Sequence, residues 1–188
     1  TLQVALVASS PFQGILLAEL YEDAYDADVM SFASNSIFDV DGNFMIKDTG
    51  IAKLDIDGDN NKVTVTIQGD YKWSDGTLLT ADDLIYPYEI IGHPKYTGIR
   101  YDGDIQNIVG MTEYHDGAAQ TISGITKVDE KTIEIQFKKL SPAINYGGDG
   151  LWTYAAPKHQ LESIPVENLL QSDAVRKNPV VLGAYVYD

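Results

Sequence analysis

Three histidines and two acidic loops are the parts of this sequence best suited to chemistry. His93, His115 and His159 lie far apart, and none is three to five residues from another, the spacing of a helical zinc pair. His115 precedes Asp116, a carboxylate that could orient an imidazole base. The sequence has no cysteine, no G-x-S-x-G turn and no glycine-rich phosphate loop. We therefore expect no catalytic residue. A hydrolase that uses His115 or His159 is an alternative that these motifs support less well than a function without catalysis.

The acidic loops at residues 39–43 and 55–61 read DVDGN and DIDGDNN. A calcium loop of the EF-hand type needs glycine at its sixth position and a bidentate glutamate at its twelfth. Both loops have glycine at the fourth position, and their twelfth residues are Gly50 and Thr66. Aspartate, asparagine and glycine favour β-turns, so we predict solvated turns and no metal site.

The overall charge excludes further classes of function. The sequence holds 28 acidic and 13 basic residues, a net charge of −15, and the basic residues are scattered. Such a surface repels nucleic acids and anionic membranes, so we expect no nucleic-acid partner. No apolar run reaches the roughly 18 residues of a membrane helix, and the first residues lack the basic segment of a signal peptide. The absence of cysteine leaves the compartment undecided.

Hydrophobic periodicity predicts the elements that would position any site. Residues 1–9 alternate as in a strand, and residues 14–33 have apolar side chains close to helical spacing. Residues 62–68 and 131–138 alternate apolar and polar side chains, which indicates two half-buried strands. The second strand follows a short polar loop, so residues 122–138 are predicted to form a β-hairpin.

The stretch KWSDGTLLTADDLI, residues 72–85, combines a turn with the start of a helix. Thr80 is placed to cap the helix, and Asp82 and Asp83 complement the positive end of its dipole. Pro87 removes a backbone donor, which predicts a kink or an early end near Tyr86. Gly92 and Pro94 would end the helix in any case. This reading assigns the stretch a structural role without chemistry.

Twelve tyrosines, with several aromatics in glycine-rich loops, are the remaining functional signal. Tyr96 and Tyr101 lie in HPKYTGIRYDGD, and Trp152 and Tyr154 lie in INYGGDGLWTYAAPKH. Tyrosine and tryptophan offer stiff, amphipathic contact area for peptides or sugars, and they suit a hydrophobic core equally well.

Residues 71–91, YKWSDGTLLTADDLIYPYEII, resemble the signature segment of the family 5 extracellular solute-binding proteins. Its usual form is an aromatic or Lys-aromatic pair, then S/H-D-G-T-x-L-T-A-x-D-V, then a helix. Val181 and Ala184 replace the usual glycine and proline of the final strand, and Pro87 replaces a usual serine. Four other stretches are similar to the family in the expected order: residues 1–16, 36–54, 124–137 and 178–188.

The resemblance implies an α+β (mixed α/β) fold, the N-terminal portion of a type II periplasmic-binding-protein-like fold with a mixed sheet and flanking helices. Residues 1–33 would start the main lobe, residues 34–165 would form an α+β subdomain, and residues 166–188 would return to the main lobe. The second lobe would be absent, which would make this sequence an N-terminal fragment of a longer receptor.

The resemblance also implies a substrate-binding component of an ABC importer that captures oligopeptides outside the cytoplasmic membrane for uptake. Its partners would be the peptide and the permease subunits, with no cofactor and no enzymatic activity. It would be an extracellular, cell-surface lipoprotein or a periplasmic protein, held at the membrane only through a lipid anchor outside this chain. Receptors of the same family for a nickel chelate or an oligosaccharide stay open.

Ligand contacts in this family run largely through peptide backbone groups, as in strand addition. The loop after the first predicted strand matches a family segment that contacts ligand, and Tyr96 or Tyr101 falls near a family tyrosine of the cleft. Together with the aromatic loop, this predicts seven ligand-binding residues: Ser9, Ser10, Pro11, Phe12, Tyr96, Tyr101 and Trp152.

Overall fold

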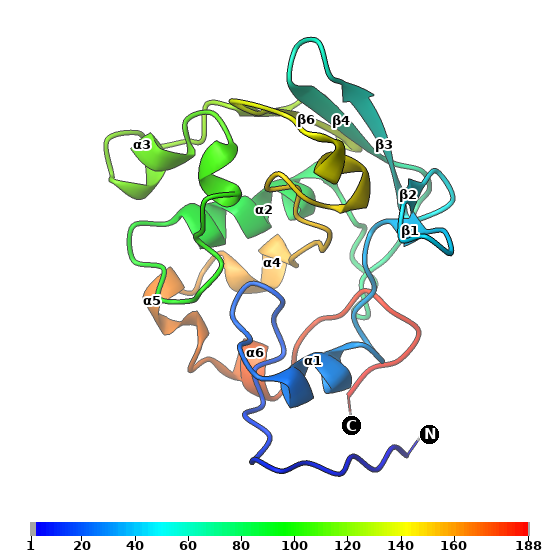
Figure 1. The fold of residues 1–188 in the computed structure, drawn as a ribbon. Helices are drawn as coiled ribbons and strands as arrows, with labels where there is room; N and C mark the ends of the chain where they lie inside the picture. The colour runs from blue at the N-terminus through cyan, green and yellow to red at the C-terminus, as the bar shows by residue number, and fades with distance from the viewer. Residues whose placement is uncertain (1–2, 188) are drawn as a thin grey trace.

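A four-stranded antiparallel sheet forms one side of the computed structural model, which describes residues 3–187 (Figure 1). The strand order is β3-β4-β6-β5, so the hairpins β3-β4 and β5-β6 join through the pairing of β4 with β6. Both predicted strands and the hairpin at residues 122–138 are confirmed. The strands are β3 (Ala52–Asp57), β4 (Lys62–Ile67), β5 (Ile125–Lys127) and β6 (Thr132–Gln136).

The inner face of the sheet carries the apolar half of each alternating pattern. Val63 pairs with Ile135 and Val65 with Ile133, and all four side chains are buried. Helix α2 (Ala81–Gly92) contacts β5 and β6 and contributes Leu84, Tyr88 and Ile91 to the same core. Alternation along the strands and burial under one helix together give the two-layer packing on this side.

The two acidic loops form the expected turns. The first joins β1 (Asp39–Val40) to β2 (Ile46–Lys47), and the second joins β3 to β4. The Asp41 carboxylate accepts hydrogen bonds from the backbone N–H groups of Asn43 and Met45, at 2.8 and 3.0 Å. Within residues 3–187, no three histidine, cysteine or acidic side chains are grouped as metal ligands.

Helix α2 begins after the predicted cap Thr80 and runs to Gly92. Of the predicted kink or early end near Tyr86, the early end is therefore wrong. Pro87 has no N–H to bond the carbonyl of Asp83, four residues earlier. The backbone N–H of Ala156 takes that place and donates to the Asp83 carbonyl at 3.0 Å. The helix continues because a distant segment satisfies the acceptor that proline leaves free.

A second group of helices covers the side of α2 opposite the sheet (Figure 1). The side chains of Tyr86 and Ile90 point to this side, where they pack with Leu161, Leu169 and Val175. Helix α2 is therefore buried on two faces. The remaining helical segments are η1 (Ile105–Asn107), α3 (Met111–His115), η2 (Pro142–Tyr146), α4 (Lys158–Leu161), α5 (Val166–Leu169) and α6 (Asp173–Arg176).

The start of the chain differs from both predictions made for it. The described part of the first predicted strand, residues 3–9, is exposed and pairs with no other strand of residues 3–187; residues 1 and 2 lie outside the described residues. Of the helix predicted over residues 14–33, only α1 (Ala24–Met30) forms. An isolated strand lacks hydrogen-bond partners, so alternation alone could not make one here.

The segment before α1 is held by hydrogen bonds to residues further along the chain. The buried Asp26 carboxylate accepts backbone N–H groups from Gln13, Gly14 and Ile15, at 3.1, 3.0 and 3.3 Å. The N–H of Leu16 donates to the carbonyl of Val175 at 3.2 Å. The apolar spacing of this segment therefore reflects its packing against the C-terminal helices rather than a helix of its own.

Among residues 3–187 no helix has the length and hydropathy that crossing a bilayer requires.

Candidate functional site

Two of the predicted ligand-binding aromatics meet at a third residue, Glu19. The indole Nε1–H of Trp152 donates to Glu19 Oε1 at 2.8 Å, and the hydroxyl of Tyr96 donates to the Glu19 backbone carbonyl. The Glu19 side chain is fully buried, whereas both aromatics are half-buried. The Trp152 backbone N–H also donates to the hydroxyl of Tyr88, at 2.8 Å. Tyr96 and Trp152 are thus both held by hydrogen bonds to Glu19, which lies in the segment before α1. We call Glu19, Tyr96 and Trp152 the Glu19 cluster.

Arg100 supplies the cation beside this cluster. Its Nη2 donates to the Tyr21 carbonyl at 3.0 Å, and its guanidinium carbon lies 4.6 Å from the centroid of the Tyr21 ring. Its backbone N–H donates to the Tyr96 hydroxyl at 3.2 Å. Arg100 therefore ties the loop after α2 to the segment that carries Glu19.

Burial decides the electrostatics of the cluster. Removal from water raises the pKa of Glu19 to about 7, although its own backbone, the Trp152 hydrogen bond and the Arg100 charge act in the opposite direction. Burial likewise raises the pKa of Tyr96 to about 12. Glu19 Oε2 has no hydrogen-bond partner among the described residues, so one carboxyl oxygen is buried without a donor.

Tyr101 does not join this cluster. Its ring stacks on His115, with ring centroids 3.6 Å apart and planes inclined by 16°. His115 Nδ1 lies 3.2 Å from the carbonyl oxygen of Gly92. The imidazole thus contacts a ring and a backbone carbonyl, neither of which is a nucleophile, and these contacts give a hydrolase that uses His115 no support. The two tyrosines that the sequence could not separate occupy different surroundings.

The predicted loop Ser9–Phe12 lies exposed beside α1. The Ser9 N–H donates to the hydroxyl of Tyr25 at 2.8 Å, and the Phe12 side chain is 50% exposed. A surface pocket of about 360 Å³ lies between the residues that follow this loop and the loop that contains Tyr96. Two segments far apart in sequence therefore border one hollow. Its lining includes Gln13, Leu20, Glu22, Asp23, Thr97 and Gly98.

The sequence reasoning missed Glu19 and Arg100. The available signal was the position of Glu19, a charged residue directly before Leu20 in an otherwise apolar run from Ile15. A charged side chain inside an apolar stripe is buried only when it has partners, so its position already called for a donor elsewhere in the chain.

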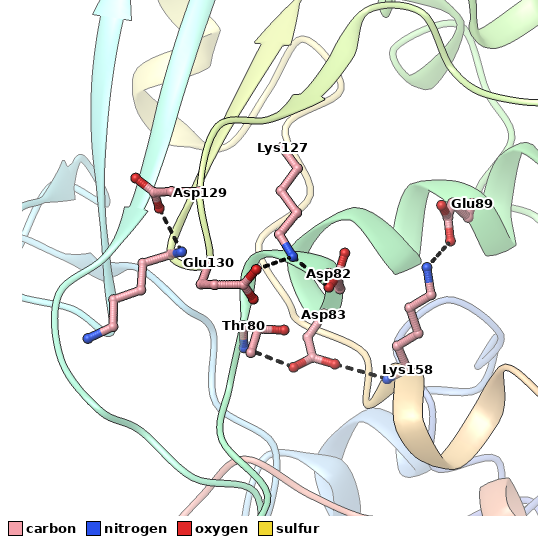
Figure 2. Close-up of polar contacts among 9 residues, drawn as sticks. Thr80, Asp82, Asp83, Glu89, Lys127, Asp129, Glu130 and Lys158 are labelled. Carbon is pink, nitrogen blue, oxygen red and sulfur yellow. Dashed lines mark hydrogen bonds and ion pairs between the residues drawn. The ribbon is translucent and has the colours of Figure 1, made fainter.

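The contacts of Asp83 give the KWSDGTLLTADDLI segment a structural role, and Figure 2 shows those with Thr80 and Lys158. The buried Asp83 carboxylate accepts hydrogen bonds from Thr80 N–H, Lys158 N–H and Trp73 Nε1–H, at 3.0, 3.0 and 3.1 Å. One side chain thus joins the turn, the start of α2 and the start of α4. The neighbouring Asp82 points outward and pairs with Lys127 at 2.8 Å (Figure 2).

The sequence relatives agree with one another. Residues 46–188 match the family model described as "Bacterial extracellular solute-binding proteins, family 5 Middle". The oligopeptide-binding protein OppA of Lactococcus lactis subsp. lactis is 34% identical over 184 residues, which cover 95% of this chain and 31% of that protein. The chain therefore spans about a third of the length of this curated relative.

Solved structures extend the likeness to the fold. The structure of lactococcal OppA, complexed with an endogenous peptide in the closed conformation, superimposes with a TM-score of 0.90 at 33% identity. That match covers 94% of this chain and 34% of the other. The Escherichia coli murein tripeptide binding protein MppA gives a TM-score of 0.70 at 22% identity, covering 93% and 33%, and shows the shared fold. The chain belongs to family 5 of the bacterial extracellular solute-binding proteins.

Proposed function

We propose that this chain is part of a receptor that captures oligopeptides outside the cytoplasmic membrane and delivers them to the permease subunits of an ABC importer. The observation that carries the proposal is the superposition on peptide-bound lactococcal OppA at a TM-score of 0.90 and 33% identity. A receptor of this kind holds its ligand without changing it, so the proposal includes no catalytic residue, metal or cofactor. A lipid anchor outside this chain would hold the receptor at the membrane.

The seven predicted contact residues enter the proposal with different support. Loop Ser9–Phe12 is exposed and leads into the wall of the 360 Å³ pocket, which the residues after Tyr96 also line. Tyr96 and Trp152 are held at one node by Glu19. Tyr101 is engaged with His115 and is the weakest candidate. We propose that the ligand lies against the first two groups.

Backbone hydrogen bonds and aromatic surface suit peptides of many sequences, because every peptide presents the same N–H and C=O groups. The strong negative charge of the chain, −15, further attracts basic peptides and repels acidic ones over long distances.

The test is calorimetry on the complete receptor with a mixed library of tri- to octapeptides, a nickel chelate and a panel of oligosaccharides. We expect heat of binding with peptides alone. Binding of the chelate or of a sugar instead of peptides would replace oligopeptides with another solute of the family. Turnover of peptide or ester substrates, abolished by His115→Ala, would overturn the receptor assignment itself.

A further inference from the structure

Glu19 is a buried acid at the junction of three segments. It belongs to the stretch before α1, its backbone carbonyl receives the Tyr96 hydroxyl, and its carboxyl receives the Trp152 indole. Its side chain is 0% exposed. Acids are rarely buried to this extent unless they are paired, and a merely structural acceptor for an indole N–H could be an uncharged amide or carbonyl.

The hydrogen bonds of the carboxyl are incomplete. Oε1 accepts from Trp152 Nε1, whereas Oε2 has no partner among residues 3–187. An ionised carboxylate offers two charged oxygens, so one of them is left without compensation. A protonated carboxyl carries its hydrogen on Oε2 and still accepts from Trp152 through Oε1. The Trp152 bond to Oε1 therefore forms in both protonation states of Glu19, and its strength differs between them.

The groups that face Glu19 do not change charge near neutral pH. Arg100 is a permanent cation. Tyr86 on α2 and Tyr96 after it have pKa values raised by burial to about 12, and burial also raises the pKa of Tyr154. With the pKa of Glu19 itself raised to about 7 by burial, the carboxyl is the member of this cluster that titrates in the neutral range.

We propose that Glu19 is a positioning residue whose carboxyl, by losing or gaining a proton, tightens or loosens the orientation of Trp152 and thereby sets the affinity for peptide. This inference rests on the proposed function, because it takes Trp152 and Tyr96 to be part of the ligand-binding wall. Hydrogen bonds to an ionised acceptor are shorter and roughly twice as strong as those to a neutral one. Deprotonation therefore holds the indole more firmly, and affinity rises with pH.

The experiment measures peptide affinity and tryptophan emission of the complete receptor from about pH 5 to pH 9, a range centred on the neutral region. The probe is a synthetic mixed library of tri- to octapeptides. Glu19→Gln keeps an oxygen acceptor for the indole and removes the titration. Glu113→Gln, an exposed acid on α3, is the matched control. Trp152→Phe identifies the part of the emission that comes from Trp152, because every other tryptophan of the receptor, Trp73 included, is unchanged in this variant.

In the wild-type receptor and in Glu113→Gln, we expect affinity to rise about fivefold through a midpoint near pH 7, as the Trp152 bond becomes charge-assisted. The emission of Trp152 should titrate with the same midpoint. Glu19→Gln should show a flat affinity profile and a flat emission profile, while still binding peptide.

The outcomes separate the two proposals. The role of Glu19 is overturned if the wild type binds peptide with an affinity that does not change with pH. It is also overturned if the pH dependence of the wild type is unchanged in Glu19→Gln. Both results leave the receptor function intact. No peptide binding at any pH overturns the receptor function, and the role in setting affinity falls with it. The emission titration needs no ligand, and it then decides whether the protonation of Glu19 controls the orientation of Trp152.

Discussion

The carbonyl oxygen of Asp83 accepts a hydrogen bond from the backbone N–H of Ala156, at 3.0 Å. Within α2 the donor for this carbonyl would be residue 87, which is a proline. The contact joins the first turn of the helix to a segment more than seventy residues further along the chain. The Asp83 carboxylate accepts three further hydrogen bonds, from the N–H groups of the Trp73 indole and of the Thr80 and Lys158 backbone. Asp83 thus joins the signature segment, residues 71–91, to Ala156 and to the start of α4.

Asp83→Asn should reduce the free energy of unfolding by about 2–4 kcal/mol, because a buried amide NH₂ would face an N–H donor that now bonds a carboxylate oxygen. Asp82→Asn, the adjacent and more exposed residue, should cost less than about 1 kcal/mol, as expected for a surface ion pair. Urea unfolding of both variants is the measurement. Equal losses for the two variants would contradict the role assigned to Asp83.

Glu19→Gln should stabilise the protein at alkaline pH relative to acidic pH. The pKa of Glu19 is raised from 4.5 to about 7 on folding, so the folded state binds the proton more tightly than the unfolded state does. The stability that the protonated acid contributes is complete below about pH 4.5 and is lost as pH rises through about 7, a change of about 3 kcal/mol. Urea unfolding at about pH 5 and pH 8 should show the wild type losing stability relative to Glu19→Gln by an amount of this order. A constant difference between them would argue against a raised pKa.

Tyr96→Phe should lower both stability and peptide affinity, because it removes the hydroxyl that joins the Glu19 carbonyl and the Arg100 N–H. We expect a loss of about 1–2 kcal/mol in unfolding free energy and about a threefold to tenfold loss in affinity. Tyr101→Phe keeps the ring that stacks on His115 and should change both by less than about 0.5 kcal/mol. Calorimetry on the two variants side by side decides between the tyrosines, and a larger effect at Tyr101 would reverse our choice.

Residues 1–188 produced alone should fold but bind peptides no more tightly than about 1 mM, or roughly −4 kcal/mol. Closure of two lobes around a ligand removes water and adds contacts. A single lobe makes fewer contacts, so less binding free energy is available to offset the entropy that a flexible peptide loses when it is immobilised. Calorimetry with the same peptide library is the check. Micromolar binding by this chain, lost in Tyr96→Ala, would show that a second lobe is dispensable.

The local elements could be predicted from the sequence because short-range rules determine them. Strands β4 and β6 alternate apolar and polar residues, and the loop DIDGDNN consists of turn-forming residues. Thr80 and the two aspartates after it mark the start of α2. The family resemblance, carried by residues 71–91, also came from sequence alone and agrees with the family match over residues 46–188.

Long-range contacts decided the rest. The sequence predicted a kink or an early end of α2 near Tyr86, but the helix runs on to Gly92, and the Ala156 N–H satisfies the carbonyl that Pro87 leaves free. The apolar spacing of residues 14–33 indicated a helix, but only Ala24–Met30 is helical, and the residues before it are held by the Asp26 carboxylate and by packing against the C-terminal helices. Periodicity records which side chains are buried, whereas the backbone conformation depends on which groups complete its hydrogen bonds.

The candidate site divides in the same way. Composition and resemblance pointed to Tyr96, Tyr101 and Trp152 as aromatics of interest. Only the folded chain brings Tyr96 and Trp152 together at Glu19, and it places the Tyr101 ring against His115 instead. Residue types specify which contacts are chemically possible, but burial, and with it the raised pKa of Glu19, arises only when segments distant in sequence exclude water from the same place.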